Sequence, residues 1–138
     1  MDYQQLLLAL LPDLLVVVAL FAALGVDYSR LRGSRLAKRY EVACQISAAG
    51  LIAGLAVLVL QIAGTMPVMD STADGQLVLN TGTLTLKALL YAMGLGVLPL
   101  AKRDHITPQV SEYFALLLLA TLGMGFVVAS RNLLGAFV

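Results

Sequence analysis

The sequence predicts an all-α membrane protein with four transmembrane helices and the start of a fifth. Composition carries the first part of this prediction. Hydrophobic residues make up 60% of the 138 residues and charged residues only 12%, with a mean hydropathy of +0.92. Soluble domains have about 45–50% apolar and about 25% charged residues. The apolar residues also gather into runs near the roughly 20 residues that cross a bilayer core as helix.

The helices are expected in four apolar runs, because helix is the open-chain structure that satisfies the backbone in lipid. The first run spans 21 residues, about 31 Å of helix at ~1.5 Å per residue. Its length and its acidic start argue against a cleaved signal peptide. The second run is interrupted only by small polar residues and Gln61, and the third carries Lys87 near its start. The expected bounds are 6–26, 42–63, 79–100 and 113–129, all within one transmembrane region, 1–138.

The composition also excludes several other classes of protein. So few charges cannot cover the surface of a soluble globular enzyme. One cysteine, Cys44, makes a disulfide framework impossible, and His105 is the single histidine, so a structural zinc site lacks ligands. A net charge of +1 offers no basic surface to nucleic acid. We therefore expect no metal, no nucleic-acid partner, and a lipid bilayer around the chain.

Charge in the connections predicts the orientation. Seven basic residues lie between the first and second and between the third and fourth helices, and none lies in residues 64–76. Basic loops stay in the cytoplasm, so the amino terminus is expected outside. The basic residues are Arg30, Arg32, Arg35, Lys38, Arg39, Lys102 and Arg103.

Two ionisable residues inside apolar runs are candidates for a proton path, Asp13 and Lys87. One interpretation makes both residues interfacial. Pro12 would then open the regular helix, with Asp13 in its first turn near the outer surface, and Lys87 would extend its ammonium to the interface. The other makes them buried groups that face a partner helix or pass protons, since an aspartate at membrane depth costs about 2.5–3.5 kcal/mol. No other catalytic residue is expected.

The remaining polar residues favour structural roles. Glu112 is expected in the first turn of the fourth helix, and Gly50 and Gly54 form a GxxxG that predicts close contact with a helix of the same chain or of another subunit. The apolar run 133–138 follows Arg131 and Asn132 without a polar cap, so we expect a fifth helix to begin there and the chain to be a fragment. Interface or loop positions are expected for Gln61, Asn80, Arg131 and His105, and an inert thiol for Cys44.

Two stretches resemble the amino-terminal part of subunit N of proton-pumping NADH–quinone oxidoreductase, the bacterial respiratory complex I. The first is QQLLLALLPDLL at residues 4–15. The second is SEYFALLLLATLGM at residues 111–124, followed by ASRNLL at residues 129–134. The glutamate-aromatic opening of the second stretch favours subunit N over the related subunits M and L and the cation–proton antiporters. The region around Asn80 is a looser match, because an aspartate common in the family is missing there.

The resemblance implies that the chain is part of a larger, antiporter-like membrane subunit of about fourteen helices. That subunit would belong to a complex that couples electron transfer from NADH to quinone with proton pumping. The NADH, flavin, iron–sulfur and quinone sites would belong to partner subunits, with other complex I membrane subunits as neighbours in the bacterial inner membrane. The family's pumping glutamate and lysines would follow Val138, so this chain would supply scaffold helices. The alternatives are an antiporter subunit of the same superfamily and a small stand-alone four-helix interaction protein.

Overall fold

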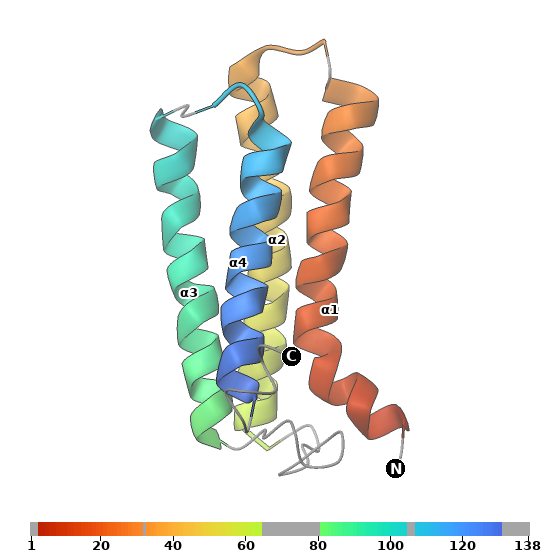
Figure 1. The fold of residues 1–138 in the computed structure, drawn as a ribbon, viewed down its shortest axis with the longest axis vertical. Coiled ribbons are helices and arrows are strands. Elements are labelled where there is room, and N and C mark those ends of the chain that lie inside the picture. Colours follow the sequence, from red (N-terminus) through yellow and green to blue (C-terminus); the bar gives the residue numbers. More distant parts are fainter. Residues whose placement is uncertain (1–2, 32, 65–80, 105–106, 131–138) are drawn as a thin grey trace.

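The computed structural model of the chain is a bundle of four antiparallel helices (Figure 1). It describes residues 3–31, 33–64, 81–104 and 107–130. The elements are α1 (Tyr3–Val26), a short π-helical segment η1 (Asp27–Leu31), α2 (Leu36–Ile62), α3 (Thr81–Asp104) and α4 (Val110–Ala129). Within the described residues, all four α-helices are long and apolar enough to cross a membrane, which confirms the predicted class and the four predicted spans. The fifth helix expected at 133–138 lies outside the described residues.

The helices extend beyond the apolar runs at the end of the bundle that carries the basic residues. α2 begins at Leu36 rather than 42, α3 continues past 100 to Asp104, and α4 begins at Val110 rather than 113. Hydropathy marks the part of a helix that lies in hydrocarbon, whereas backbone hydrogen bonding continues through the charged turns at the interface. These expected bounds were therefore too short.

Pro12 lies inside α1 and does not open it, which corrects the first interpretation of Pro12. Proline has no N–H, so the carbonyl four residues earlier, that of Leu8, loses its helical donor. Gln61 of α2 supplies a donor instead, with its Nε2 at 2.8 Å from the Leu8 oxygen. Gln61 is buried, and its expected place at the interface was wrong. The kink-prone turn of α1 is thus hydrogen-bonded to α2.

α2 packs against each of the other three helices, whereas α1 and α3 lie on opposite sides of the bundle, separated by α2 and α4 (Figure 1). The GxxxG face of α2 meets α1, because a Cβ built on Gly50 would collide with the side chain of Ala19. Small residues let helix backbones approach closely in lipid. The motif therefore serves a contact within this chain.

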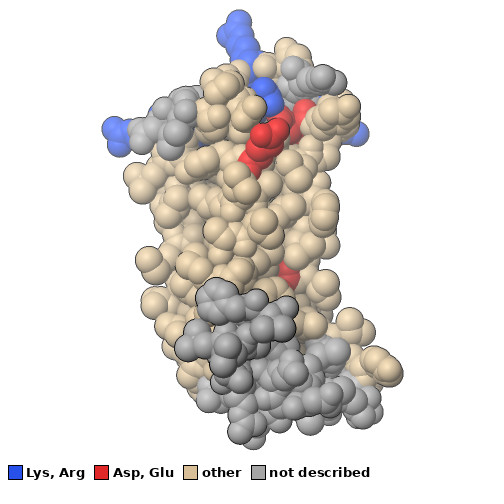
Figure 2. Space-filling view, viewed as in Figure 1, with Lys and Arg blue, Asp and Glu red and all other residues tan. Residues whose placement is uncertain are grey.

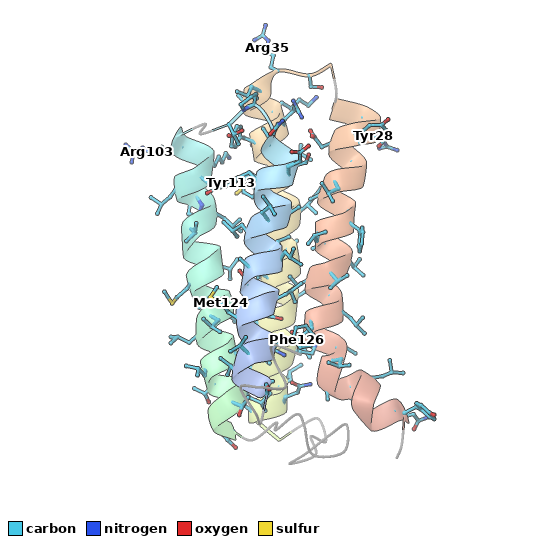
Figure 3. The ribbon with its side chains drawn as sticks, in the orientation of Figure 1. Tyr28, Arg35, Arg103, Tyr113, Met124 and Phe126 are labelled. Atoms are coloured by element: carbon cyan, nitrogen blue, oxygen red, sulfur yellow. The ribbon has the colours of Figure 1, made fainter. Side chains whose placement is uncertain are left out.

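On the face shown in Figure 2, the visible Lys and Arg side chains gather at one end of the bundle. Arg35 and Arg103 extend from this end, at the start of α2 and the end of α3 (Figure 3). A hydrogen-bonded contact also fixes the α3–α4 connection there. The Tyr40 hydroxyl donates to the carbonyl of Thr107 at 2.6 Å and accepts from its N–H at 2.8 Å. The two connections that carry the basic residues therefore lie at the same end of the bundle.

Candidate functional site

Asp13 of α1 and Lys87 of α3 form an ion pair in the interior of the bundle. Lys87 Nζ donates to Asp13 Oδ2 at 2.5 Å, although the two residues are 74 positions apart in the sequence. Only 3% of Asp13 and 2% of Lys87 is exposed. The fold thus brings both predicted proton-path candidates together, and it corrects the interpretation that placed them at the interface.

Lys87 lies near the start of α3, as the sequence predicted, but its side chain faces the interior of the bundle rather than the outside. It follows Thr81 by six residues, which places it about 9 Å from the amino-terminal end of the helix. A lysine at that depth reaches the interface if its side chain faces lipid. Here the side chain points inward and reaches across the bundle to α1. The rotation of α3 about its own axis, rather than the depth of Lys87 in the membrane, therefore determines what the Lys87 side chain contacts.

Tyr91 completes the cluster, and the sequence analysis missed it. Its hydroxyl donates to Asp13 Oδ1 at 2.6 Å, so each carboxylate oxygen accepts from one side chain of α3. Tyr91 follows Lys87 by four residues and therefore lies on the same face of α3. That spacing was the available signal, but a tyrosine in an apolar run is uninformative until the facing carboxylate is known.

Two glycines make room for these side chains to cross from α3 to α1. A Cβ on Gly54 of α2 would lie 2.8 Å from Tyr91 Cε2, and one on Gly125 of α4 would lie 3.1 Å from Lys87 Cε. The ring of Phe126 provides an apolar face 5.7 Å from Lys87 Nζ (labelled in Figure 3). A cation within about 6 Å of an aromatic ring is attracted by the ring quadrupole. The cluster is therefore enclosed by α2 and α4 without being crowded.

The electrostatics of the cluster follow from its burial. Charges in a low-dielectric interior pay a desolvation cost that only close partners offset. The Asp13 carboxylate has an ammonium and a phenol as donors, so each of its two oxygens accepts a hydrogen bond. Removing one partner of such a pair costs about 3–5 kcal/mol, while replacing both by apolar groups is often neutral. A carboxylate and an ammonium can each gain or lose a proton, so the chemistry within reach of this pair is proton exchange. Among the described residues, no group of three or more His, Cys, Asp or Glu side chains could hold a metal ion.

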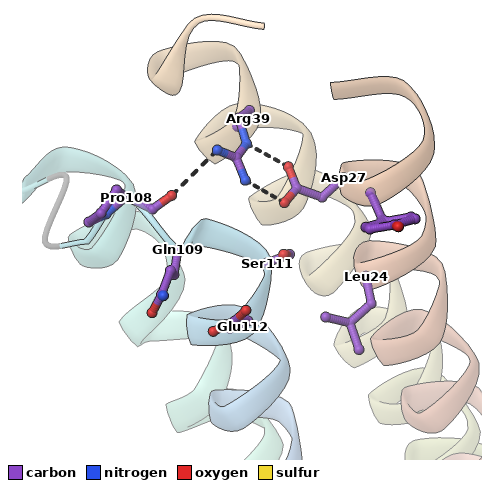
Figure 4. A pocket seen from close by; sticks show the side chains of 8 residues that line it. Leu24, Asp27, Arg39, Pro108, Gln109, Ser111 and Glu112 are labelled. Atoms are coloured by element: carbon purple, nitrogen blue, oxygen red, sulfur yellow. Dashed lines mark hydrogen bonds and ion pairs between the residues drawn. The ribbon is translucent and has the colours of Figure 1, made fainter. Parts of the chain in front are cut away.

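A second ion pair lies at the charged end of the bundle, and it joins η1 to α2. Arg39 donates from Nε to Asp27 Oδ1 at 2.7 Å and from Nη2 to Asp27 Oδ2 at 2.6 Å. Its Nη1 reaches the carbonyl of Pro108 at 3.4 Å, beside a cavity of about 550 Å³ (Figure 4). A bidentate arginine–carboxylate pair fixes geometry as well as charge. The sequence analysis had counted Arg39 only among the basic residues, and it had not considered Asp27.

The other predicted polar positions have mixed outcomes. Glu112 lies in the first turn of α4, as predicted. Cys44 is half-buried, with Sγ at 3.8 Å from the carbonyl of Leu98. Asn80, His105 and Arg131 lie outside the described residues.

Comparison with known proteins finds one informative relative. The chain is 37% identical over 145 aligned residues to NADH-quinone oxidoreductase subunit N 2 of Acidobacterium capsulatum. The alignment covers 99% of this chain but 28% of the relative, so the chain spans little more than a quarter of that protein's length. No family model and no solved structure matches the chain. The similarity agrees with the resemblance to subunit N carried by residues 4–15 and 111–134.

Proposed function

We propose that this chain is part of a membrane subunit of proton-translocating NADH:quinone oxidoreductase, and that its four helices belong to the frame of that subunit. The similarity to a subunit N over nearly the whole chain is the observation that carries the proposal. Four apolar helices with an ion pair between them are consistent with a membrane subunit of a proton pump. Other membrane subunits of the complex would be the partners, and the exposed apolar faces of the bundle would meet them or lipid.

The electron carriers of the reaction are assigned to other subunits. An iron–sulfur cluster is held by about four cysteine thiolates. This chain has one cysteine, Cys44. The resemblance to subunit N further implies that NADH, flavin, iron–sulfur clusters and quinone would serve the complex as a whole. The contribution of this chain would be to proton translocation.

The proposed location is the bacterial inner membrane, with the amino terminus outside. The support is the charged end of the bundle, since connections rich in Lys and Arg stay in the cytoplasm. Single cysteines in a Cys44→Ser background test this orientation. A membrane-impermeant thiol reagent applied to intact cells should label Gly64→Cys, and it should label Ser34→Cys only after permeabilisation. The reverse pattern would overturn the orientation.

Disruption of the gene in its own organism tests the function. We expect loss of NADH:quinone reductase activity and of NADH-driven proton translocation in membrane vesicles, and recovery of both when the gene is restored. A tagged chain should also co-migrate with NADH dehydrogenase activity on native gels. Loss of cation–proton exchange with normal NADH oxidation would instead identify an antiporter subunit. A tagged chain that migrates alone would support the stand-alone four-helix protein.

A further inference from the structure

We infer that Asp13 is a proton-exchange residue in the half of the bundle remote from the basic end, with Lys87 and Tyr91 as positioning residues. The inference rests on the proposed function, because it assigns part of the proton translocation to this chain. It is carried by the ion pair between Asp13 Oδ2 and Lys87 Nζ at 2.5 Å and by the Tyr91 hydroxyl at 2.6 Å from Asp13 Oδ1.

A purely structural role accounts poorly for this cluster. A buried ion pair stabilises a fold no better than a well-packed apolar pair of similar volume. α1 is already joined to α2 by the contact of Gly50 with Ala19 and by the hydrogen bond of Gln61 to Leu8. α3 packs closely on both α2 and α4. Ionisable groups inside membrane helices are expensive and usually mark proton or ion pathways.

Among the described residues, Lys87 and Tyr91 are the side chains that hydrogen-bond to the Asp13 carboxylate. From α2 the cluster is faced by Gly54, and from α4 by Gly125 and Phe126. These residues are uncharged, and no described residue other than Lys87 forms an ion pair with Asp13. Asp27, the other acidic residue of this first span, lies 14 residues away, about 21 Å along the helix. A proton gained by the Asp13 carboxylate therefore turns a neutral ion pair into a cluster with one net positive charge.

The proposed step adds and removes one proton without any redox change. In the resting state, the Asp13 carboxylate accepts from the Lys87 ammonium and from the Tyr91 phenol. A proton arriving from water forms an O–H bond on the carboxylate, while Lys87 keeps its ammonium and Tyr91 keeps its phenolic proton. Release to water breaks that O–H bond and restores the ion pair. Lys87 lies about 9 Å from the amino-terminal end of α3, so the aqueous phase at that end of the bundle is the nearer of the two.

Two matched double variants in the complete subunit and complex separate proton exchange from structure. Asp13→Asn with Lys87→Met removes both charges of the cluster, and Asp27→Asn with Arg39→Met removes both charges of the ion pair near the basic end. Both proteins should assemble, as judged by native gels, and both should oxidise NADH in uncoupled vesicles. We expect the cluster variant alone to show a lower ratio of protons translocated to NADH oxidised. A native ratio in the cluster variant would overturn the inference.

Tyr91→Phe provides a milder test that preserves the ion pair and the ring packing. The phenol donates to one oxygen of the Asp13 carboxylate, so its loss removes one of the two side chains that position Asp13. The pH profile of proton translocation should therefore change shape or position, with little change in NADH oxidation at the optimum. A purely structural tyrosine would change assembly or total activity and leave the profile in place, which would count against the inference.

Infrared spectroscopy of the purified complex gives a readout that does not depend on pumping. Lowering the pH should produce the carbonyl stretch of a protonated carboxylic acid that is absent in Asp13→Asn. Absence of that difference would overturn the inference even if the complex pumps normally. If native vesicles show no NADH-driven translocation that depends on this gene, the proposed function fails, while the infrared result still decides whether Asp13 exchanges a proton.

Discussion

Gln61 of α2 donates a hydrogen bond to the carbonyl of Leu8, the group that Pro12 leaves without a donor in α1. The proline and the glutamine are therefore linked, although they lie in different helices. In lipid no water competes for the free carbonyl, so a side chain from the neighbouring helix takes the place of the missing N–H. This contact joins α1 to α2 near the end that lacks the basic cluster.

Replacing Gln61 should therefore destabilise the bundle, and Pro12 should determine by how much. Gln61→Leu removes the donor and should lower the free energy of unfolding in detergent by about 1 kcal/mol. In a Pro12→Ala background the alanine N–H can bond to Leu8, so the same change should cost less. A double-mutant cycle measures the coupling between the two positions. Equal costs in both backgrounds would contradict this account.

Gly54→Ala should disturb the cluster because its new Cβ would lie 2.8 Å from Tyr91 Cε2 and 3.2 Å from the carbonyl of Pro12. Overpacking of this kind costs about 1–3 kcal/mol. Gly123→Ala on α4 is the matched control, since its Cβ meets no atom within 4 Å in the described structure. Thermal unfolding in detergent should show a loss for the first variant and none for the second. Equal effects would mean that Gly54 is not required for close packing.

Arg39→Lys should weaken the joint between η1 and α2 while keeping the positive charge. The guanidinium makes two bonds to Asp27, at 2.7 and 2.6 Å, and a lysine ammonium cannot reproduce that fork. We expect a loss of about 1 kcal/mol, because a hydrogen bond to a charged group contributes roughly 1.5–3 kcal/mol and the new ammonium recovers part of it. Chemical denaturation in detergent measures this loss. If Arg39→Met costs no more than Arg39→Lys, the charge contributes nothing.

Tyr40→Phe should loosen the connection between α3 and α4. The hydroxyl both donates to and accepts from the backbone of Thr107, and its ring is fully buried against Phe114. Phenylalanine keeps the ring contact and removes the two hydrogen bonds. Hydrogen exchange should therefore become faster at the Thr107 amide and stay unchanged in the middle of α4. Unchanged exchange at Thr107 would show that this pair does not fix the connection.

The number and approximate place of the helices could be predicted from sequence, because hydropathy sums over neighbouring residues and needs no knowledge of the fold. The predicted ends were less accurate at the charged end, where α2 begins at Leu36 and α3 continues to Asp104. There the chain leaves hydrocarbon but remains helical. The prediction of Glu112 in a first helical turn succeeded for a similar local reason, since it depends on residues next to it in the chain.

The roles of Asp13, Lys87 and Gln61 could not be decided in this way. Each of them was compatible with an interfacial position along its own helix. Their burial depends on how α1, α2 and α3 are rotated about their axes, and contacts between distant residues determine that rotation. Tyr91 was missed for the same reason, because its significance depends on a carboxylate that lies 78 residues away.

Sequence alone therefore determined that the described part of the chain has four helices apolar enough to span a membrane, and that seven of the nine basic residues lie in or beside two connections. It also singled out Asp13 and Lys87 as ionisable residues within apolar runs. Tertiary structure alone decided that these charges face each other, that Tyr91 joins them, and that Gly54 and Gly125 make room for the crossing. The physical reason is that the free energy of transferring a segment into lipid depends on the residues of that segment alone. Which face of a helix is buried is instead a property of how the segments pack together.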